Sequence, residues 1–141
     1  IARGGKTTYH GPGHLVCYPL IQLQEGVRDL HAYLSALEEA LIRTVQDFGL
    51  QGGRDPRNTG CWVAGRKIAS IGVAVRRWVT YHGVALNIST DLSMFQRFDP
   101  CGLEADVMTT MEREVAGKLP PFADVSATLA RHMKEILREE N

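Results

Sequence analysis

The most regular pattern of hydrophobic and polar positions lies in residues 29–48. Its apolar residues recur every three or four positions, at Leu30, Tyr33, Leu34, Leu37, Leu41, Val45 and Phe48. This spacing predicts an amphipathic α-helix, and Gly49 stands where a left-handed C-terminal cap is common. The same spacing predicts a C-terminal helix that begins near Pro121 and buries Val125, Leu129, Met133, Ile136 and Leu137.

Short apolar runs with many β-branched residues predict the first strands of a sheet. Residues 15–23 are predicted to form a strand interrupted at Pro19, which cannot donate to a strand ladder and indicates a sheet edge or a bulge. Residues 61–63 and 67–75 have the pattern of a β-hairpin that turns at residues 64–66.

The rest of the sheet is predicted from less regular signals. Residues 78–88 are expected to form a further pair of strands around Gly83, and residues 107–111 another strand. Asp91 is expected to cap a short helix that runs through Phe95.

Glycine and proline mark three loops, at residues 3–14, 51–60 and 99–102. Proline disfavours the helical conformation in the residue before it, so Pro100 places Cys101 on a loop.

The order of these elements lacks the regular βαβ rhythm of a parallel sheet. We therefore expect an α/β (α+β) fold with a mixed, mostly antiparallel sheet flanked by helices. A chain of 141 residues suits one domain.

Composition narrows the class of function. The 16 Lys and Arg residues balance 16 Asp and Glu residues, so the formal charge is zero. Nucleic acids and anionic membranes attract clustered positive charge, which a neutral chain lacks. No apolar run approaches the roughly 20 residues that span a bilayer, and the start has no signal-peptide pattern. We expect a soluble protein with neither nucleic-acid nor membrane partners.

The three cysteines are candidates for nucleophilic chemistry, because a thiolate is a strong nucleophile near neutral pH. Their scattered positions argue against a disulfide framework or a zinc site and favour a reducing compartment. Cys17 and Cys61 lie in apolar runs typical of buried strands. Cys101 lies between Pro100 and Gly102 on a tight loop, where it is either an exposed nucleophile or part of an ordinary turn.

Lys67 and several histidines are candidates for the accompanying base. Lys67 begins an apolar strand, where desolvation would favour a neutral, proton-accepting amine; the alternative is a surface lysine at a strand end. His10, His14 and His82 lie beside glycines and leave a Cys–His pair open. The two other histidines, on predicted helices, are expected at the surface or its boundary: His31 and His132.

Two kinds of cofactor site lack support in the sequence. His10 and His14 have the spacing of a helical metal pair, but the glycines and proline between them cannot form a helix interior. Dinucleotide and phosphate-loop glycine motifs are also missing. No metal and no cofactor is therefore expected.

Five motifs follow one another along the chain. The first is Arg3-Gly4-Gly5-Lys6-Thr7-Thr8-Tyr9-His10-Gly11-Pro12-Gly13, with Tyr18-Pro19-Leu20 behind it. The others are Gly60-Cys61-Trp62-Val63, Arg66-Lys67-Ile68-Ala69-Ser70-Ile71-Gly72, His82-Gly83-Val84-Ala85-Leu86-Asn87 and Pro100-Cys101-Gly102. Together they closely resemble the motifs of the lipoyl(octanoyl) transferases. Collinear matches over most of the chain are far more specific than a single short motif.

The resemblance implies a fold shared with lipoate and biotin protein ligases. Family members carry sheet strands before the Arg-Gly-Gly motif, so residues 1–141 are expected to be a single octanoyltransferase catalytic domain that is truncated at its N-terminus. It also implies a catalytic dyad of Cys101, the nucleophile that forms the acyl thioester, and Lys67, the acid/base that activates the thiol. The implied acyl-binding residues are Arg3, Gly4, Gly5, Lys6, Thr7, Thr8, Tyr9, His10, Ser70, Ile71, Gly72, Gly83, Val84 and Ala85. Tyr9 and the strand residues near Ile71 and Val84 are expected to form apolar walls for the acyl chain.

The implied reaction moves an octanoyl group from octanoyl-acyl carrier protein to a lysine of lipoyl-domain proteins, such as 2-oxoacid dehydrogenase E2 subunits and glycine cleavage H protein. We expect a monomer in the bacterial cytoplasm, with the mitochondrial matrix as the alternative compartment. Two alternative functions stay open: an amidotransferase that moves octanoyl or lipoyl groups between lipoyl domains, and a non-catalytic fragment that only binds them. An unrelated α/β domain is the remaining alternative.

Overall fold

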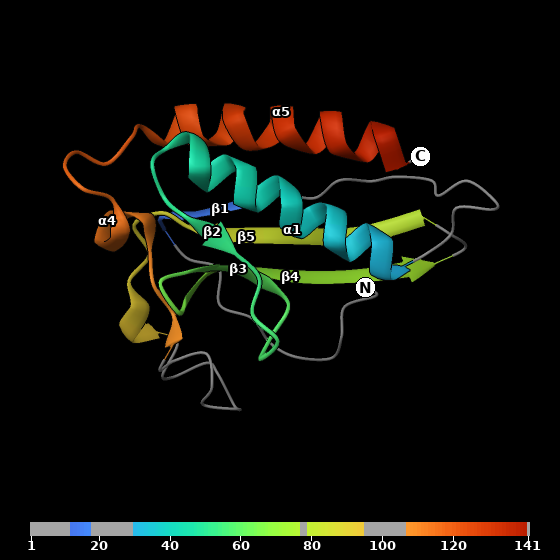
Figure 1. The fold of residues 1–141 in the computed structure, drawn as a ribbon, viewed down its shortest axis with the longest axis horizontal. Helices are drawn as coiled ribbons and strands as arrows, with labels where there is room; N and C mark the ends of the chain where they lie inside the picture. The colour runs from blue at the N-terminus through green and yellow to red at the C-terminus, as the bar shows by residue number, and fades with distance from the viewer. Residues whose placement is uncertain (1–11, 18–29, 77–78, 95–106, 141) are drawn as a thin grey trace.

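The computed structural model describes residues 12–17, 30–76, 79–94 and 107–140 (Figure 1). Within these residues, five strands form one antiparallel sheet in the order β1-β5-β4-β3-β2. The strands are β1 (His14–Cys17), β2 (Gly52–Gly53), β3 (Gly60–Val63), β4 (Arg66–Arg76) and β5 (Val79–Asn87). The helices are α1 (Leu30–Asp47), the 3-10 helix η1 (Leu92–Met94), α4 (Met111–Glu114) and α5 (Phe122–Glu140).

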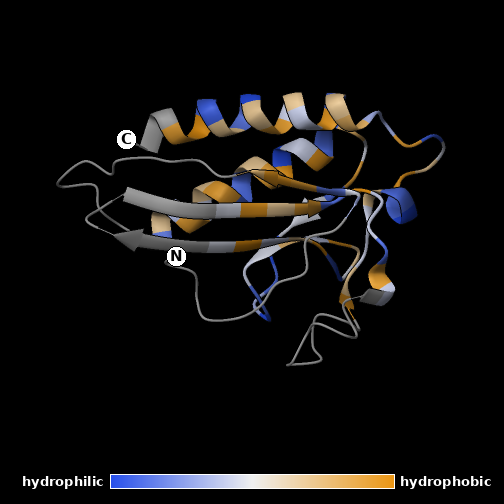
Figure 2. Cartoon of the chain, turned by 180° about the vertical axis from the view of Figure 1, so that it is seen from behind, coloured by the Kyte–Doolittle hydropathy of each residue, from blue (hydrophilic) through white to orange (hydrophobic). Residues whose placement is uncertain are grey.

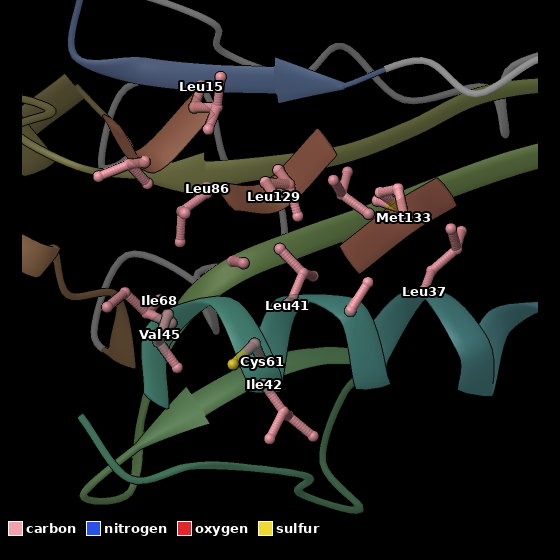
Figure 3. Close-up of a cluster of buried hydrophobic side chains, with 14 of the residues drawn as sticks. Leu15, Leu37, Leu41, Ile42, Val45, Cys61, Ile68, Leu86, Leu129 and Met133 are labelled. Carbon is pink, nitrogen blue, oxygen red and sulfur yellow. The ribbon is translucent and has the colours of Figure 1, made fainter. Parts of the chain in front are cut away.

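The two long helices pack against each other and against the sheet (Figure 1). Their apolar faces and the strands bury a continuous core, in which Leu37 and Leu41 of α1 meet Leu129 and Met133 of α5 (Figure 3). Figure 2 shows α5 with alternating hydrophilic and hydrophobic bands, as its spacing predicts. Both predicted helices and the mostly antiparallel sheet are confirmed.

The end of α1 follows from its sequence. Gly49 adopts a left-handed φ of 88°. The Gly49 N–H donates to the carbonyl of Gln46 at 3.0 Å, and the Leu50 N–H donates to that of Val45 at 3.0 Å. These two bonds are those of a Schellman cap, which satisfies carbonyls that the last helical turn leaves without partners.

The β3–β4 hairpin turns where the sequence predicts. Ala64 and Gly65 both have positive φ, 52° and 77°, as in the type I′ turns that match the twist of paired strands. At the other side of the sheet, β1 lies on the edge, as the strand with Pro19 predicts, although Pro19 itself lies outside the described residues.

Three sequence predictions are wrong. In place of the strand pair expected over residues 78–88, the structure has the single strand β5, Val79–Asn87, because Gly83 pairs with Gly72 of β4 and does not turn the chain. Residues 107–111 make only one bridge, since the Thr110 hydroxyl accepts a hydrogen bond from the Arg113 N–H at 3.2 Å and starts α4 at once. The loop at residues 51–60 contains the two-residue strand β2.

Candidate active site

Lys67 occupies an unusual place for a lysine. It is the second residue of β4, only 2% exposed, and the largest of the fully buried side chains. Its Nζ donates a hydrogen bond to Oδ1 of Asn58 at 2.5 Å. Of the two sequence interpretations, the buried lysine is therefore correct. Fully buried lysines are rare unless a partner satisfies the ammonium group or function requires it.

A β-bulge decides which way Lys67 points. Cys61 pairs with Ala69, and the next β3 residue, Trp62, pairs with Lys67, so Ile68 is an extra residue in β4. Cys61, Ile68 and Ala69 all belong to the core beneath the helices, where Ile68 lies beside Val45 (Figure 3). Without the bulge, strand alternation would place Lys67 on the same face as Ala69. The bulge therefore turns Lys67 to the opposite face of the sheet, where regular strand alternation already places its partner Trp62.

Residues 95–106 include Cys101, and the segment directly after them lies beside Lys67. Met108 forms a parallel bridge with Lys67, and the Thr109 N–H donates to the Lys67 carbonyl at 2.8 Å. The buried Asn87 amide donates to the Thr109 carbonyl at 3.1 Å. The main chain seven residues beyond Cys101 is thus fixed beside Lys67.

An ion pair also joins α4 to the start of β4. Glu114 of α4 accepts from Arg66 through both oxygens, at 2.9 and 3.0 Å, and from the Thr109 hydroxyl at 2.5 Å. The Arg66 guanidinium, assisted by Thr109, holds the pKa of Glu114 below its ordinary value. The segment after residues 95–106 is thereby tied to β4 by side chains as well as by backbone.

The predicted acyl-binding segments of β4 and β5 lie side by side. Ser70 pairs with Ala85 and Gly72 with Gly83. Because Ser70 lies one residue from the core residue Ala69, these four residues lie on the face to which Lys67 points. This face therefore presents small residues next to the lysine.

The third pair of these segments, Ile71 and Val84, has its side chains on the other face. Val84 belongs to the core beneath the helices, and its partner Ile71 packs against that core. Their side chains therefore do not wall the opposite face, because strand alternation turns them away from it. The other predicted wall, Tyr9, and all of Arg3, Gly4, Gly5, Lys6, Thr7, Thr8 and His10 lie outside the described residues.

The two cysteines that the structure describes, Cys17 and Cys61, lie in strands, as predicted. Cys61 is completely buried, and burial raises the pKa of its thiol to about 12. Burial also raises the pKa of the half-buried Cys17. In both, burial disfavours the thiolate, which is the nucleophilic form of a cysteine. Cys101 lies outside the described residues and stays a prediction.

The histidines have separate places in the fold. His14 lies in β1 rather than in a loop and pairs with Asn87, while His82 lies in β5 opposite Val73. Val73 is six residues along β4 from Lys67, roughly 20 Å at the usual rise of a strand. His10 lies outside the described residues. Of the helical histidines, His31 is exposed and His132, largely buried, contacts Asp47 at 2.8 Å.

The described residues contain neither a cluster of metal-ligating side chains nor a membrane-spanning helix. No three His, Cys, Asp or Glu side chains within them gather as they would around a metal ion. In the same part of the chain, no helix is long and apolar enough to cross a membrane.

Sequence reasoning missed Asn58, Thr109 and Glu114. Asn58 stands in a loop rich in Gly and Pro, where an asparagine is ordinary. Nothing local in the sequence pairs it with Lys67, and Thr109 and Glu114 were part of an expected strand and its flank. Contacts between segments distant in sequence place them: Asn58 bonds to Lys67, the Thr109 N–H donates to the Lys67 carbonyl, and Glu114 bonds to Arg66 and Thr109.

Comparison with known proteins gives this arrangement a family context. The model of the lipoyl protein ligase A/B catalytic domain matches residues 1–134. A protein named Octanoyltransferase from Solibacter usitatus is 50% identical over 134 residues, which are 95% of this chain and 60% of that protein. Another of that name, from Syntrophobacter fumaroxidans, is 44% identical over 140 residues, 99% of this chain and 61% of that protein. The chain thus spans about 60% of the length of these curated relatives.

Solved structures share the fold at low sequence identity. A chain in the structure of a bipartite lipoate protein ligase and its E2 lipoyl domain from Thermoplasma acidophilum superposes with a TM-score of 0.76 at 19% identity, covering 96% of this chain and 56% of that one. Biotin protein ligase from Aquifex aeolicus gives a TM-score of 0.70 at 14% identity, covering 90% of this chain and 54% of that one. The expected likeness to lipoate and biotin protein ligases is therefore confirmed for the fold.

Proposed function

Because this chain belongs to the lipoyl protein ligase A/B catalytic domain family, we propose that it is the catalytic part of an acyltransferase that attaches octanoyl groups to lipoyl-domain proteins. The donor is octanoyl-acyl carrier protein, and Cys101 carries the acyl group between donor and acceptor. The observation that carries this proposal is the identity of 50% and 44% with relatives named Octanoyltransferase. The buried Lys67 and the residues that surround it support the proposed chemistry.

In the first half-reaction, the neutral Lys67 amine takes the proton of the Cys101 thiol. The sulfur attacks the carbonyl carbon of the donor thioester, and the bond between that carbon and the carrier sulfur breaks. The carrier leaves as a thiolate and receives the proton from the Lys67 ammonium. One thioester replaces another, so the acyl group stays activated.

In the second half-reaction, the amine of the acceptor lysine attacks the acyl carbon on Cys101. The carbon–sulfur bond breaks and an amide forms, while the proton of the attacking amine passes through Lys67 to the Cys101 thiolate. A single base serves both steps, and general acid–base catalysis of this kind typically contributes 10²- to 10⁴-fold to the rate.

The acyl chain is proposed to lie along the face formed by Ser70, Gly72, Gly83 and Ala85. With carbon–carbon bonds of about 1.5 Å, an extended octanoyl chain is roughly 9 Å long. Ser70 lies three residues from Lys67, roughly 10 Å along a strand. A chain that starts beside Lys67 therefore ends close to Ser70 and its partner Ala85, while Gly72 and Gly83 lie further along the strands. Each buried CH₂ group contributes about 0.8 kcal/mol. The segment from Arg3 to His10 is proposed to cover the chain, as the resemblance implies.

The proposed acceptors are lipoyl domains, including those of 2-oxoacid dehydrogenase E2 subunits and glycine cleavage H protein. A fold neighbour is a bipartite lipoate protein ligase described with its E2 lipoyl domain, which supports this class of acceptor. The relatives come from bacteria, and we propose the bacterial cytoplasm as the compartment and a monomer as the working form.

The acyl-enzyme intermediate provides the test. After incubation with octanoyl-acyl carrier protein, intact-mass measurement is expected to show one added octanoyl group, and peptide mapping to locate it on Cys101. Cys101→Ala is expected to abolish the adduct, and Lys67→Met to slow its formation by roughly 10²-fold or more. An adduct that persists in Cys101→Ala contradicts the mechanism. An octanoylated lipoyl domain that acts as the better donor would instead favour the amidotransferase.

A further inference from the structure

We propose that Asn58 is the positioning residue for Lys67, and that it holds the amine through a neutral acceptor so that the amine can change its charge. This inference rests on the base role proposed above for Lys67. The observation that carries it is the hydrogen bond from Lys67 Nζ to Asn58 Oδ1 at 2.5 Å.

Hydrogen bonds other than the one to Lys67 hold Asn58 in place. The Asn58 carbonyl accepts a hydrogen bond from Trp62 Nε1 at 3.0 Å, and its N–H donates to the Asp55 carbonyl at 3.3 Å. Trp62 is buried and pairs with Lys67 in the strand register. Both backbone groups of Asn58 are therefore held, which gives its side-chain oxygen a defined position.

Arg57 supports the same arrangement from outside. Its guanidinium lies 4.5 Å from the centroid of the Trp62 ring, in cation–π geometry. It also forms two hydrogen bonds with the carboxylate of Asp55, at 2.8 and 2.9 Å, and this guanidinium lowers the pKa of Asp55 to about 2. Asp55, Arg57, Trp62 and Asn58 thus form a connected platform that ends at the lysine.

The main chain restricts the lysine stem. A Cβ atom at Gly60 would lie 3.0 Å from Cε of Lys67 and 2.3 Å from the carbonyl oxygen of Ala69. The backbone of β3 therefore packs directly against the stem. Because the stem is held in this way, Nζ of Lys67 has few possible positions. The hydrogen bonds of Nζ then decide the direction of the amine lone pair.

Three carboxylates among the described residues around this site are each paired with an arginine. Glu38 of α1, which accepts from the Gly60 N–H, is bound by Arg54 at 3.1 Å. Asp55 of the loop is bound by Arg57, and Glu114 of α4 by Arg66. Each of these negative charges is thus balanced by its arginine. Asn58, which accepts a hydrogen bond directly from Lys67 Nζ, carries no charge.

A neutral acceptor suits a base that gains and loses a proton. An amide oxygen accepts an N–H from an ammonium and from a neutral amine alike, because both carry hydrogens. A carboxylate at the same place would favour the charged ammonium and oppose its deprotonation. Asn58 therefore orients the nitrogen in both states, and the neutral amine keeps its lone pair for the thiol or the acceptor amine.

Two variants of Asn58 separate position from charge. Asn58→Leu keeps the volume and removes the acceptor; the octanoyl-transfer kcat is expected to fall roughly 10- to 100-fold, with KM for the octanoyl carrier unchanged. Asn58→Asp keeps the acceptor and adds charge; the pH of half-maximal rate is expected to rise by roughly one unit or more. Thr59→Ala, at the exposed neighbouring position, is the matched control and is expected to leave both unchanged.

Thermal denaturation and the Lys67→Met variant complete the test. Asn58→Asp is nearly isosteric, so an unchanged denaturation midpoint with a shifted pH profile supports positioning. If Lys67→Met abolishes transfer while both Asn58 variants keep the normal rate and pH profile, the role of Asn58 is overturned and that of Lys67 stands. If Lys67→Met keeps full activity, the proposed base fails, and Asn58 with it.

Discussion

Gly60 is a single residue on which the geometry around Lys67 depends. No side chain fits at this position, because the first carbon of one would collide with the Ala69 carbonyl and press on the lysine stem. Gly53, in the neighbouring strand, has nothing within 4 Å of the same point. The two glycines therefore have different reasons to be glycine, although both look like loop residues in the sequence.

Gly60→Ala is expected to lower the free energy of unfolding by roughly 1–3 kcal/mol, the usual cost of overpacking. The added methyl group must move either β3 or Lys67, so transfer activity is expected to fall as well. Urea denaturation and the transfer assay measure the two effects. Gly53→Ala is the control, and equal behaviour of the two variants would contradict the close packing at Gly60.

The β3–β4 hairpin is the element that presents Lys67. Its turn places Ala64 at a φ of 52°, in the left-handed region that side chains with a Cβ avoid. Asparagine tolerates this region and is the preferred first residue of a type I′ turn before glycine. The hairpin thus carries local strain that the sequence could relieve without any change in the sheet.

Ala64→Asn is therefore expected to raise the free energy of unfolding by up to about 1 kcal/mol, seen as a higher midpoint in thermal denaturation. Gly65→Ala is expected to act in the opposite direction, because φ at this position is 77°. A lower midpoint for Ala64→Asn would show that the turn is not the type I′ turn described here.

At the scale of the whole molecule, ion pairs and hydrogen bonds join elements that are far apart in the sequence. Glu114 joins Arg66 of β4 and Thr109 of the returning segment, while Asp47 at the end of α1 joins Arg131 and His132 of α5. The Glu114 cluster is the more buried of the two. It fixes the connection that leads from Cys101 back to the sheet.

This cluster predicts how stability depends on pH. Arg66 lowers the pKa of Glu114 in the folded protein below its ordinary value of 4.5, so unfolding at low pH takes up a proton. The stabilisation is fully present above about pH 4.5 and is lost as pH falls through the lowered value. Urea denaturation is expected to show wild type more stable than Glu114→Gln at pH 7, with the difference shrinking toward pH 3. Glu112→Gln, on the exposed side of α4, is the control; an equal pH dependence for both variants would contradict the role of the cluster.

Much of the fold follows from local pattern. The three- and four-residue spacing determined α1 and α5, Gly49 determined the end of α1, and the apolar runs around Ala64 and Gly65 determined the hairpin. Each of these signals acts between residues close in sequence, where propensity and periodicity are informative. Where a signal had two meanings, the sequence failed: Gly83 suggested a turn, and its pairing with Gly72 across the sheet made it part of a strand.

The sequence alone also determined the family motifs and named Lys67 and Cys101, of which Cys101 stays a prediction. Only the tertiary structure decided that the Lys67 side chain points away from the core beneath the helices, because one extra residue in β4 reverses the face of the sheet on which it lies. It likewise decided that Asn58, Gly60 and Thr109 surround the lysine. Periodicity describes what each segment can bury, whereas strand register and bulges, set by packing between distant segments, decide which side chains meet.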